Sequence, residues 1–481
     1  MQKNFLANIS FLILANLLVK PLYIFGIELV VQNKVGESEY GFYFALFNLA
    51  LVGQIFLDFG INNFNSRAIA QQPQLLPNYV GVIIPFKIVL SISYLMLCYA
   101  FAAFIGYPAE QWYWLFFIAL IQIIASFSLY IRSNLQGLHH FRQDSYLSIA
   151  DRICLLLLAG TWLAYTNNIN IRQFIYLQTI AYTLAAFWGA YYLYRSLPNG
   201  ITWHFDRVLV QKIARQTYPF ALLSLFIAGN SRLESVWLTY WLPTSVGAYE
   251  AGMYAQSYRL LDAANMIAVL FATVLMPTFS RLLHQGESIN RLTGFSGRLL
   301  FVGASTLSIC SCFFAQPILQ TLYPHSTSDS VTIFYYLSLS FIATSSCYVY
   351  GTLLTAKGMI RALNGIAGGI LLFNLLADYL LINHNGAIGA AQAACLTQVI
   401  AALAYLTLSL KTCHLSTSWQ QTFRLVAFVI GTIIIAYLCL HLPYFWAVSW
   451  LVAIFFSLLW SVLLGLWNWH TIINILKSEQ S

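Results

Sequence analysis

The sequence predicts an all-α integral membrane protein with about 14 transmembrane helices. We expect two pseudo-symmetric six-helix lobes around a central cavity, followed by two extra C-terminal helices. Three observations lead to this prediction: an apolar composition, a series of apolar runs long enough to cross a bilayer, and one long segment that occurs twice.

Composition decides the class of protein. Hydrophobic residues make up 60% of the 481 residues, charged residues make up only 8%, and the mean hydropathy is +0.72. A soluble core of this length cannot absorb so much apolar surface, so the chain is predicted to cross a membrane many times. The net charge of +8 does not indicate nucleic acid, because the basic residues are spread singly. We therefore expect the lipid bilayer, and no nucleic acid, as a partner.

The apolar runs have the length of about 20 residues that a bilayer-spanning helix needs. The last two runs are the least distinct pair. The predicted spans are 10–31, 40–60, 79–104, 112–134, 147–166, 172–194, 217–241, 252–278, 297–316, 331–355, 362–383, 387–410, 423–442 and 445–467.

The basic residues predict the orientation of these spans. When the N-terminus is placed in the cytoplasm and the loops alternate, most of the 23 lysines and arginines fall on cytoplasmic segments and their flanks, Arg152 among them. Only Lys34 and Arg172 fall outside, and four others lie within spans: Lys20, Lys87, Arg232 and Arg259. This bias predicts an even number of spans with both termini in the cytoplasm. The N-terminal apolar run, which Lys20 interrupts, is expected to be a retained first span rather than a cleaved signal.

The span count predicts four segments. Residues 1–195 form an N-lobe with spans 1–6, and 217–411 form a C-lobe with spans 7–12. Residues 196–216 are a cytoplasmic elbow, in which Asp206 is expected to cap a short amphipathic helix. Residues 412–481 carry spans 13 and 14 and a short tail.

The repeated segment runs from Lys20 to about Ala70 and again from Arg232 to about Leu283. Each copy begins with a cation inside an apolar helix, crosses a short loop and re-enters at a Glu-x-Gly-x-Tyr motif. The motif residues are Glu39, Gly41 and Tyr43 in the first copy and Glu250, Gly252 and Tyr254 in the second. A repeat at this long spacing indicates two similar lobes rather than a solenoid.

Charges inside the spans are the candidate functional residues, because an ionised side chain in mid-bilayer is costly unless it faces protein or water. Lys20, followed by a helix-kinking Pro21, and Arg232 occupy matching places in the two copies. Two such cations would converge on one cavity and suit an anion such as phosphate. Alternatively, each cation pairs with a carboxylate of its own lobe for structural reasons.

Arg259 is the third candidate cavity cation. Asp262 follows it at i+3 on the same helix face, so a local ion pair competes with a substrate contact. Three buried acids, Glu28, Glu234 and Asp262, are candidates for a coupling step in which a carboxyl group takes up H⁺ or Na⁺. Asp378, with Asn374 one turn away, is a weaker candidate for an ion site.

Two further charges in spans are expected to have no role in transport. Asp58 is predicted to mark a helix end and turn, and Lys87 is expected to snorkel to the cytoplasmic interface. The eight cysteines lie mostly in apolar runs without zinc-ligand spacing, so we interpret them as packed thiols. We expect no metal, no cofactor and no catalytic residue.

Membrane enzymes are disfavoured by what the loops contain. There is no Walker A motif, and no outside loop exceeds roughly 20 residues. A membrane glycosyltransferase or polymerase needs a larger catalytic loop with its own acid and base groups. We therefore predict that the chain is not an enzyme.

The repeated segment resembles the polysaccharide-transporter branch of the MATE-like MOP flippase superfamily, the branch of the O-antigen and other lipid-linked oligosaccharide flippases. The resemblance rests on Glu39, Gly41, Tyr43, Asn48, Leu57 to Gly60 and Arg67 to Ala70, and on Gly252 to Tyr254, Arg259 to Ala263, Pro277, Ser280 and Arg281. It implies an inner-membrane protein that moves undecaprenyl-pyrophosphate-linked glycan to the outer leaflet by alternating access. It also implies H⁺ or Na⁺ coupling, a polysaccharide polymerase partner, and cavity cations at Lys20, Arg232 and Arg259.

Two other hypotheses remain open. A relative in the same superfamily exports small cationic compounds, or flips the peptidoglycan precursor. A cation exporter should have an acidic cavity, whereas Lys20 and Arg232 are basic. The remaining hypothesis is a membrane enzyme of cell-envelope synthesis, which would require an outside carboxylate or histidine but not Lys20 or Arg232.

Overall fold

The computed structural model describes residues 15–197, 200–201, 203, 206–415 and 418–466, and over these ranges the regular elements are helices only. The elements are η1 (Ile24–Glu28), α2 (Leu29–Val35), α3 (Glu37–Gly53), α4 (Ile55–Asp58), α5 (Ile61–Gln71), η2 (Pro73–Leu75), α6 (Leu76–Ile105), α7 (Ala109–Gly137), α8 (Phe141–Thr166), α9 (Ile171–Arg195), α10 (Arg207–Arg232), α11 (Glu234–Trp241), α12 (Thr244–Gln285), α13 (Asn290–Phe313), α14 (Ala315–Leu322), α15 (Ser328–Ala356), α16 (Ile360–Cys413), α17 (Trp419–Leu440) and α18 (Trp446–Leu463).

The predicted all-α membrane class is confirmed. Among the described residues, 11 helices are long and apolar enough to cross a membrane. The predicted number of about 14 spans is not confirmed by this count. The difference lies in α9 and α10, which are not among the 11, and in α16, which counts once although Gly386 interrupts its helical backbone (φ 54°, ψ −132°).

The chain forms two compact units, and two of their boundaries lie inside the long helices α12 and α16. Unit 1 contains residues up to Ala263 together with Ile360–Ala393, and unit 2 contains Ala264–Met359 together with the residues from Ala394 on. The predicted lobes, with boundaries at 195 and 217, stay a prediction.

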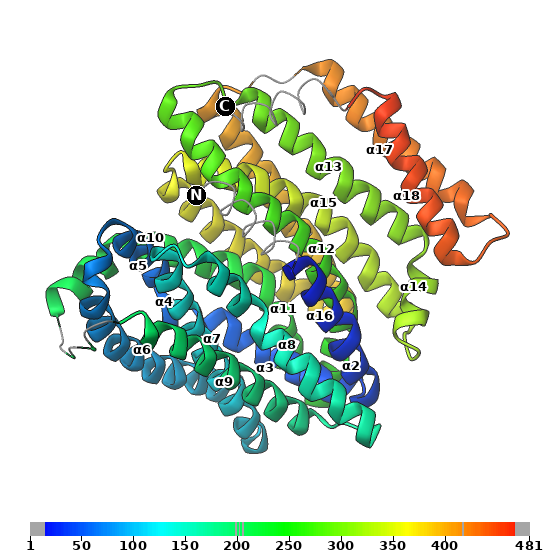
Figure 1. Ribbon diagram of the computed structural model, residues 1–481. Coiled ribbons are helices and arrows are strands. Elements are labelled where there is room, and N and C mark those ends of the chain that lie inside the picture. The colour runs from blue at the N-terminus through cyan, green and yellow to red at the C-terminus, as the bar shows by residue number, and fades with distance from the viewer. Residues whose placement is uncertain (1–14, 198–199, 202, 204–205, 416–417, 467–481) are drawn as a thin grey trace. The chain divides into compact units, whose positions relative to one another are not determined.

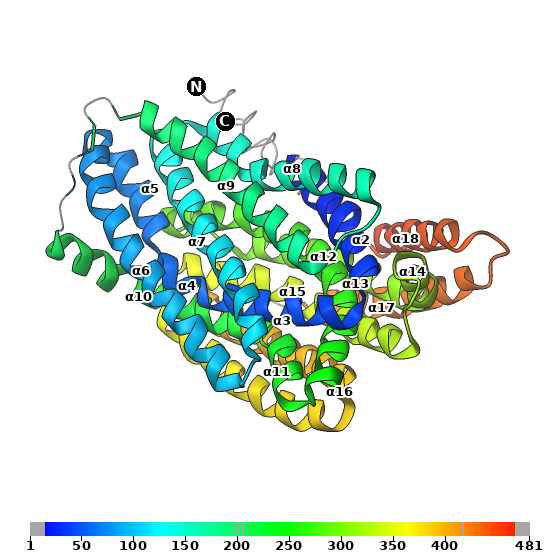
Figure 2. The same ribbon diagram turned by 90° about the horizontal axis from the view of Figure 1, so that it is seen from below.

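In unit 1, α7 packs against α5, α8 and α9 (Figures 1 and 2). The apolar core between these helices is buried and consists of Ile69, Leu76, Val80, Ile131, Leu135, Leu147, Leu193 and Leu197. The start of α9 is fixed by a capping box, in which the Asn170 side chain accepts from the Gln173 N–H and the Gln173 side chain accepts from the Asn170 N–H.

In unit 2, α13 packs against α15, and α17 packs against α18. Two buried groups hold these helices together: Leu275, Phe279, Leu300, Val349 and Leu353 around α13 and α15, and Ile309, Phe314, Ala436 and Ala453 between α13, α17 and α18.

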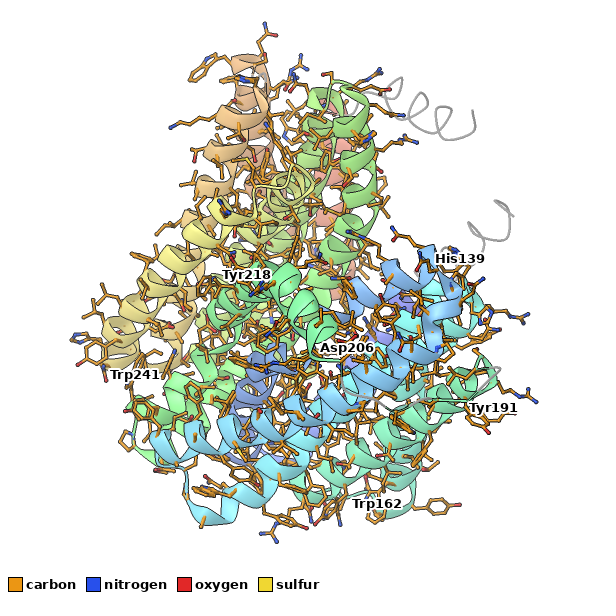
Figure 3. The ribbon with its side chains drawn as sticks, turned by 90° about the vertical axis from the view of Figure 1, so that its left-hand side faces the viewer. His139, Trp162, Tyr191, Asp206, Tyr218 and Trp241 are labelled. Atoms are coloured by element: carbon orange, nitrogen blue, oxygen red, sulfur yellow. The ribbon has the colours of Figure 1, made fainter. Side chains whose placement is uncertain are left out.

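Large apolar side chains cover the outside of the helices. Leu18 is 58% exposed and Phe104 is 71% exposed, and Figure 3 shows Trp162 and Tyr191 at the surface of unit 1. In water such a surface would aggregate, whereas in a bilayer it faces lipid tails. The exposed apolar surface therefore agrees with the membrane assignment.

The predicted elbow needs one correction. Asp206 does cap a helix, since its Oδ1 accepts from the N–H groups of Val208 (2.9 Å) and Leu209 (3.0 Å). That helix, α10, is not short: it continues to Arg232 and contains Pro219. Asp206 therefore starts the same helix that carries Arg232 into the membrane region.

Lys87 also departs from the expectation, whereas Asp58 follows it. α4 ends at Asp58, and the next two residues, Phe59 and Gly60, are left-handed (φ 44° and 76°). Lys87 does not snorkel; it is 1% exposed and its Nζ donates to the carbonyl oxygen of Leu57 (2.9 Å) and to Ser126 Oγ (2.7 Å). The interruption between α4 and α5 leaves carbonyl groups without helix partners, and the ammonium group satisfies one of them.

The two glycines that the repeat aligns, Gly41 in α3 and Gly252 in α12, contact each other within unit 1. A Cβ added to Gly41 would meet the backbone of Ala248 and Gly252, and a Cβ added to Gly252 would meet the backbone of Glu37. Only glycine permits this close approach of two helix backbones. The approach positions the polar side chains that follow each glycine.

We expect Gly252→Ala to destabilise the protein by about 1–3 kcal/mol, because rigid backbone atoms cannot move aside for the new methyl group. Thermal unfolding of the purified protein in detergent measures this. Gly365→Ala is the matched control: its added Cβ would meet nothing within 4 Å. Equal melting temperatures for both variants would contradict the close approach.

Candidate functional site

The helices that begin the two repeat copies are both irregular. Pro21 lies in the first span, and the five-residue π-helix η1 follows it, closed by the Leu29 N–H bonding to the Ile24 carbonyl. In the second copy, α10 and α11 meet at Leu233, whose backbone stays near helical (φ −80°, ψ −16°). π-turns and interrupted membrane helices are frequent at functional sites, because they redirect side chains into the protein.

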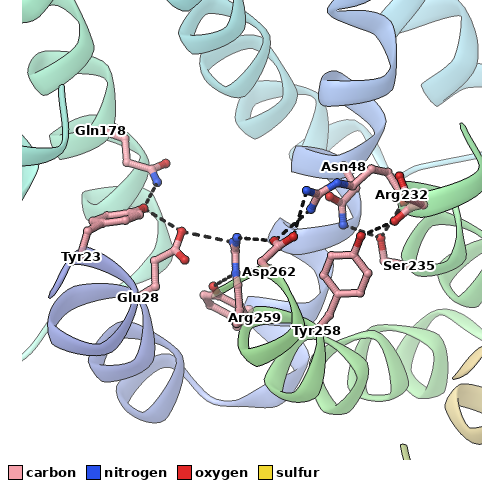
Figure 4. A network of polar contacts seen from close by, with 11 residues as sticks. Tyr23, Glu28, Asn48, Gln178, Arg232, Ser235, Tyr258, Arg259 and Asp262 are labelled. Carbon is pink, nitrogen blue, oxygen red and sulfur yellow. Dashed lines mark hydrogen bonds and ion pairs between the residues drawn. The ribbon is translucent and has the colours of Figure 1, made fainter. Parts of the chain in front are cut away.

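Arg259 lies at the centre of a buried polar network (Figure 4). Its Nη2 is 3.3 Å from Glu28 Oε1, its Nη1 is 3.9 Å from Asp262 Oδ2, and its Nε donates to Tyr40 Oη at 3.2 Å. The Arg259 and Glu28 side chains are only 8% and 5% exposed. Arg259 therefore has a closer partner than the i+3 aspartate that its sequence position suggests.

Arg232 extends this network through Asp262. Its two terminal nitrogens donate to Asp262 Oδ2 at 3.1 Å and Oδ1 at 3.0 Å, which is the bidentate geometry of a strong arginine–carboxylate pair. The guanidinium group also lies 5.1 Å from the ring centroid of Tyr258. Arg232 is thus paired with a carboxylate, which is the alternative to convergence of Lys20 and Arg232 on an anion such as phosphate.

On its other side the network continues through Glu28. Tyr23 donates to Glu28 Oε1 at 2.7 Å, and the Gln178 amide donates to Tyr23 Oη at 3.4 Å. Tyr43, from the repeated motif, donates to Gln178 Oε1 at 2.9 Å. The network thus joins the first span, α3, α9, α10 and α12 inside unit 1.

The charges of the network cancel. Two arginines, Arg232 and Arg259, face two carboxylates, Glu28 and Asp262. Pairing of this kind is what makes charge tolerable inside an apolar helix bundle, because each unpaired ion would cost several kcal/mol. The balance also means that this network, as it stands, offers no excess positive charge to an anion.

Lys20 lies outside that network. The charged group that acts on it most strongly is Arg152 in α8, followed by Asp151 and Arg132. Arg132 is itself occupied, because its Nε donates to Asp144 Oδ1 at 2.6 Å. The convergence of Lys20 and Arg232 on one anion stays a prediction.

Glu234 and Asp378 form an acidic group in unit 1, next to Arg232 of the network. They are 1% and 0% exposed and interact electrostatically with each other. Glu234 Oε2 and both Asp378 carboxyl oxygens have no hydrogen-bond partner among the described residues, and the Tyr254 hydroxyl beside them has none either. Three hydroxyl or carboxyl groups with open positions, enclosed by protein, can take up a proton or a small cation.

The structure therefore brings together four of the six predicted site residues, Glu28, Arg232, Arg259 and Asp262, and places Lys20 and Glu234 in other surroundings. Sequence reasoning missed Tyr23 and Gln178. Gln178 could have been found from the sequence, because it is a polar residue inside an apolar run. Tyr23 could not, because it reaches Glu28, five residues further on, only through the wider turn of the π-helix η1. In the described part of the chain, no group of three or more His, Cys, Asp and Glu residues is placed to hold a metal ion.

Comparison with known families gives one match. Residues 5–283 match the model of a family described as polysaccharide biosynthesis protein. No curated protein matches the chain.

Solved structures of membrane transporters share the fold. Lipid II flippase MurJ in an inward closed conformation has a TM-score of 0.72 and 15% identity, over 94% of this chain and 97% of that one. An inward-facing MATE family transporter of the MOP superfamily has a TM-score of 0.64 and 14% identity, over 84% and 98%. A MOP superfamily transporter from Pyrococcus furiosus has a TM-score of 0.59 and 15% identity, over 85% and 96%. The predicted MOP-type fold is therefore confirmed, and at these identities the likeness extends to the fold alone.

We expect Glu28→Gln to destabilise the protein by about 3–5 kcal/mol, because the change leaves Arg259 buried without its closest carboxylate. The double variant Glu28→Gln/Arg259→Gln should lose less than the sum of the single variants, with a coupling of about 0.5–3 kcal/mol. Arg281→Gln, at an exposed arginine of the second repeat copy, is the control and should be neutral. Strictly additive losses in thermal unfolding would contradict the ion pair.

Proposed function

Because the chain belongs to the polysaccharide biosynthesis protein family, we propose that it is a flippase and not an enzyme. It moves oligosaccharide units linked to undecaprenyl pyrophosphate across the bacterial cytoplasmic membrane, for the synthesis of surface polysaccharide. The observation that carries this proposal is the set of charged side chains buried within apolar helices, since such charges mark a substrate or ion route. Both termini are proposed to be cytoplasmic, and a polysaccharide polymerase is the proposed partner.

Lys20, Arg232 and Arg259 are the proposed contacts of the substrate. A pyrophosphate oxygen pair can replace a carboxylate on an arginine fork with little change in geometry. In the proposed alternating-access cycle, Arg232 and Arg259 release the carboxylates of Asp262 and Glu28 and bind the pyrophosphate group instead. When the substrate leaves, the two ion pairs form again. The carboxylates keep the arginines paired whenever the substrate is absent.

Ion coupling is proposed to use Glu234 together with Asp378. Two ionised carboxylates enclosed by protein repel each other, and a shared proton or a bound Na⁺ relieves that repulsion. Glu28 and Asp262 are the other candidate coupling acids, although their carboxylates are occupied by arginines.

Two observations favour the alternative functions. The fold similarity to a lipid II flippase is compatible with transport of the peptidoglycan precursor, whose pyrophosphate would suit the same cations. The open Glu234–Asp378 pair is compatible with export of a small cation. A membrane enzyme, in contrast, would not depend on Lys20 or Arg232.

Deletion of the gene tests the proposal. We expect lipid-linked oligosaccharides to accumulate on the cytoplasmic side and surface polysaccharide to be lost, with both defects reversed by the wild-type gene. Normal surface glycan with altered resistance to cationic compounds would instead support the exporter. Rescue of a strain depleted of its peptidoglycan-precursor flippase would support the remaining alternative.

In the same strain, we expect Lys20→Ala and Arg232→Ala to abolish surface glycan and Lys20→Arg and Arg232→Lys to restore part of it, because the anion requires the charge. Protein levels measured by immunoblot are the control. Full transport by both alanine variants at normal levels would disprove the cation contacts.

For coupling, we expect Glu234→Gln and Asp378→Asn to remove the dependence of transport on an imposed H⁺ or Na⁺ gradient in proteoliposomes. The exposed Glu39→Gln should leave that dependence intact. A gradient response that survives in both acid variants would exclude this pair as the coupling site.

A further inference from the structure

In unit 1 the first span contacts α8, and this contact contains Lys20 from the first span and Arg152 from α8. We call it the seam between the two helices. Asn16, in the first span, donates to Ser148 Oγ of α8 at 3.1 Å. One to two turns further along the same helices, the Arg152 guanidinium lies 4.7 Å from the ring centroid of Tyr23. Lys20 is four residues after Asn16 and three before Tyr23, so it lies on the same helix face and toward α8. Arg152 and Asp151 of α8 are accordingly among the charged groups that act on Lys20.

Arg152 lies well inside its helix. α8 begins at Phe141, so Arg152 is 11 residues from the start, about 16 Å along the axis. α8 starts six residues before the predicted span at 147, and the expected place of Arg152 on a cytoplasmic flank stays a prediction. Within a membrane-spanning helix a cation must face protein or water rather than lipid.

Aromatic rings hold Arg152 in place, rather than a hydrogen-bonded carboxylate. Tyr23 and Tyr182 lie 4.7 and 5.5 Å from its guanidinium carbon. Over the described residues its closest carboxylate oxygen is Asp151 Oδ2, at 3.8 Å from Nε, which is longer than a hydrogen bond. Tyr182 also makes a side-chain hydrogen bond with Arg152. Stacking on ring faces fixes a guanidinium group while its remaining N–H groups can bind a ligand. The side chain is 25% exposed, so a ligand can reach it.

The local charge differs from that of the Arg232–Arg259 network. Two acids act on Arg152, Asp151 and Glu28, but Glu28 is already paired with Arg259. Asp151 alone therefore faces Lys20 and Arg152, which leaves one net positive charge. Lys20 has no ion pair or side-chain hydrogen bond among the described residues. The network around Arg259 is neutral. An anion is therefore attracted to the seam between the first span and α8, not to a site where carboxylates already occupy the arginines.

We infer that Lys20 and Arg152, with Tyr23 and Tyr182 as the supporting rings, form the subsite that binds the pyrophosphate group of the lipid-linked substrate. This inference rests on the proposed function and changes one part of it, because the partner of Lys20 in anion binding is Arg152 and not Arg232. Tyr23 connects the subsite to the ion-pair network, since the same side chain stacks on Arg152 and donates to Glu28.

Binding of farnesyl pyrophosphate to the purified full-length protein in detergent tests the subsite, with farnesol as the uncharged counterpart. We expect wild type to prefer the pyrophosphate. Arg152→Gln and Lys20→Gln should each weaken that binding by about tenfold or more, as loss of a charge-assisted hydrogen bond does. Arg152→Lys should retain part of the affinity, because it keeps the charge.

Arg142→Gln is the matched control, because Arg142 lies on the same helix and also stacks on a tyrosine, Tyr146, at 5.7 Å. We expect it to bind like wild type, and a thermal melt of each variant identifies misfolded protein. Wild-type affinity in a folded Arg152→Gln protein would overturn the subsite while leaving the flippase proposal intact. No preference of the wild-type protein for farnesyl pyrophosphate over farnesol would count against the proposed substrate itself.

Discussion

The ion pair between Glu28 and Arg259 is the contact on which the polar interior of unit 1 depends. Both side chains are almost fully buried in helices that are otherwise apolar, and neither charge would be tolerated there alone. The pair links the π-helix of the first span to α12. Asp262, also in α12, forms the second ion pair of the network with Arg232. The glycine contact between Gly41 and Gly252 brings the helices close enough for these side chains to meet.

This arrangement separates three kinds of charge within one unit. The arginine–carboxylate network is neutral, with each charge beside an opposite one, which suits contacts that open and close during transport. The acidic group of Glu234 and Asp378 is enclosed and has open oxygens, which suits a small cation. The seam of Lys20 and Arg152 keeps one net positive charge, which suits an anionic headgroup. A flippase that couples an anionic lipid to a cation requires sites of both signs.

Composition, repeat and charge pattern were enough to predict the all-α membrane class and the intramembrane charges of interest, and the family resemblance of the repeated segment implied the MOP-type fold. They could not predict which charges pair. Glu28 is eight residues from Lys20, close to the same face of a regular helix, but η1 inserts a wider turn and directs Glu28 to Arg259. Lys87 was expected to snorkel because the sequence does not show its hydrogen-bond acceptor. That acceptor is the carbonyl oxygen of Leu57, which lies at the interruption between α4 and α5. The contacts of Arg152 could not be predicted because the two rings that lie over it, Tyr23 and Tyr182, belong to other helices.

Flipping of an anionic lipid by this protein can be measured with purified protein in liposomes that contain a fluorescently labelled, pyrophosphate-linked oligosaccharide lipid. A membrane-impermeant glycosidase added outside measures how much of the headgroup becomes accessible. Headgroups in the inner leaflet are protected from the glycosidase. We expect them to become accessible with wild-type protein and to stay protected with Lys20→Ala. Equal protection in wild-type and protein-free vesicles, with an imposed ion gradient present, would contradict this expectation.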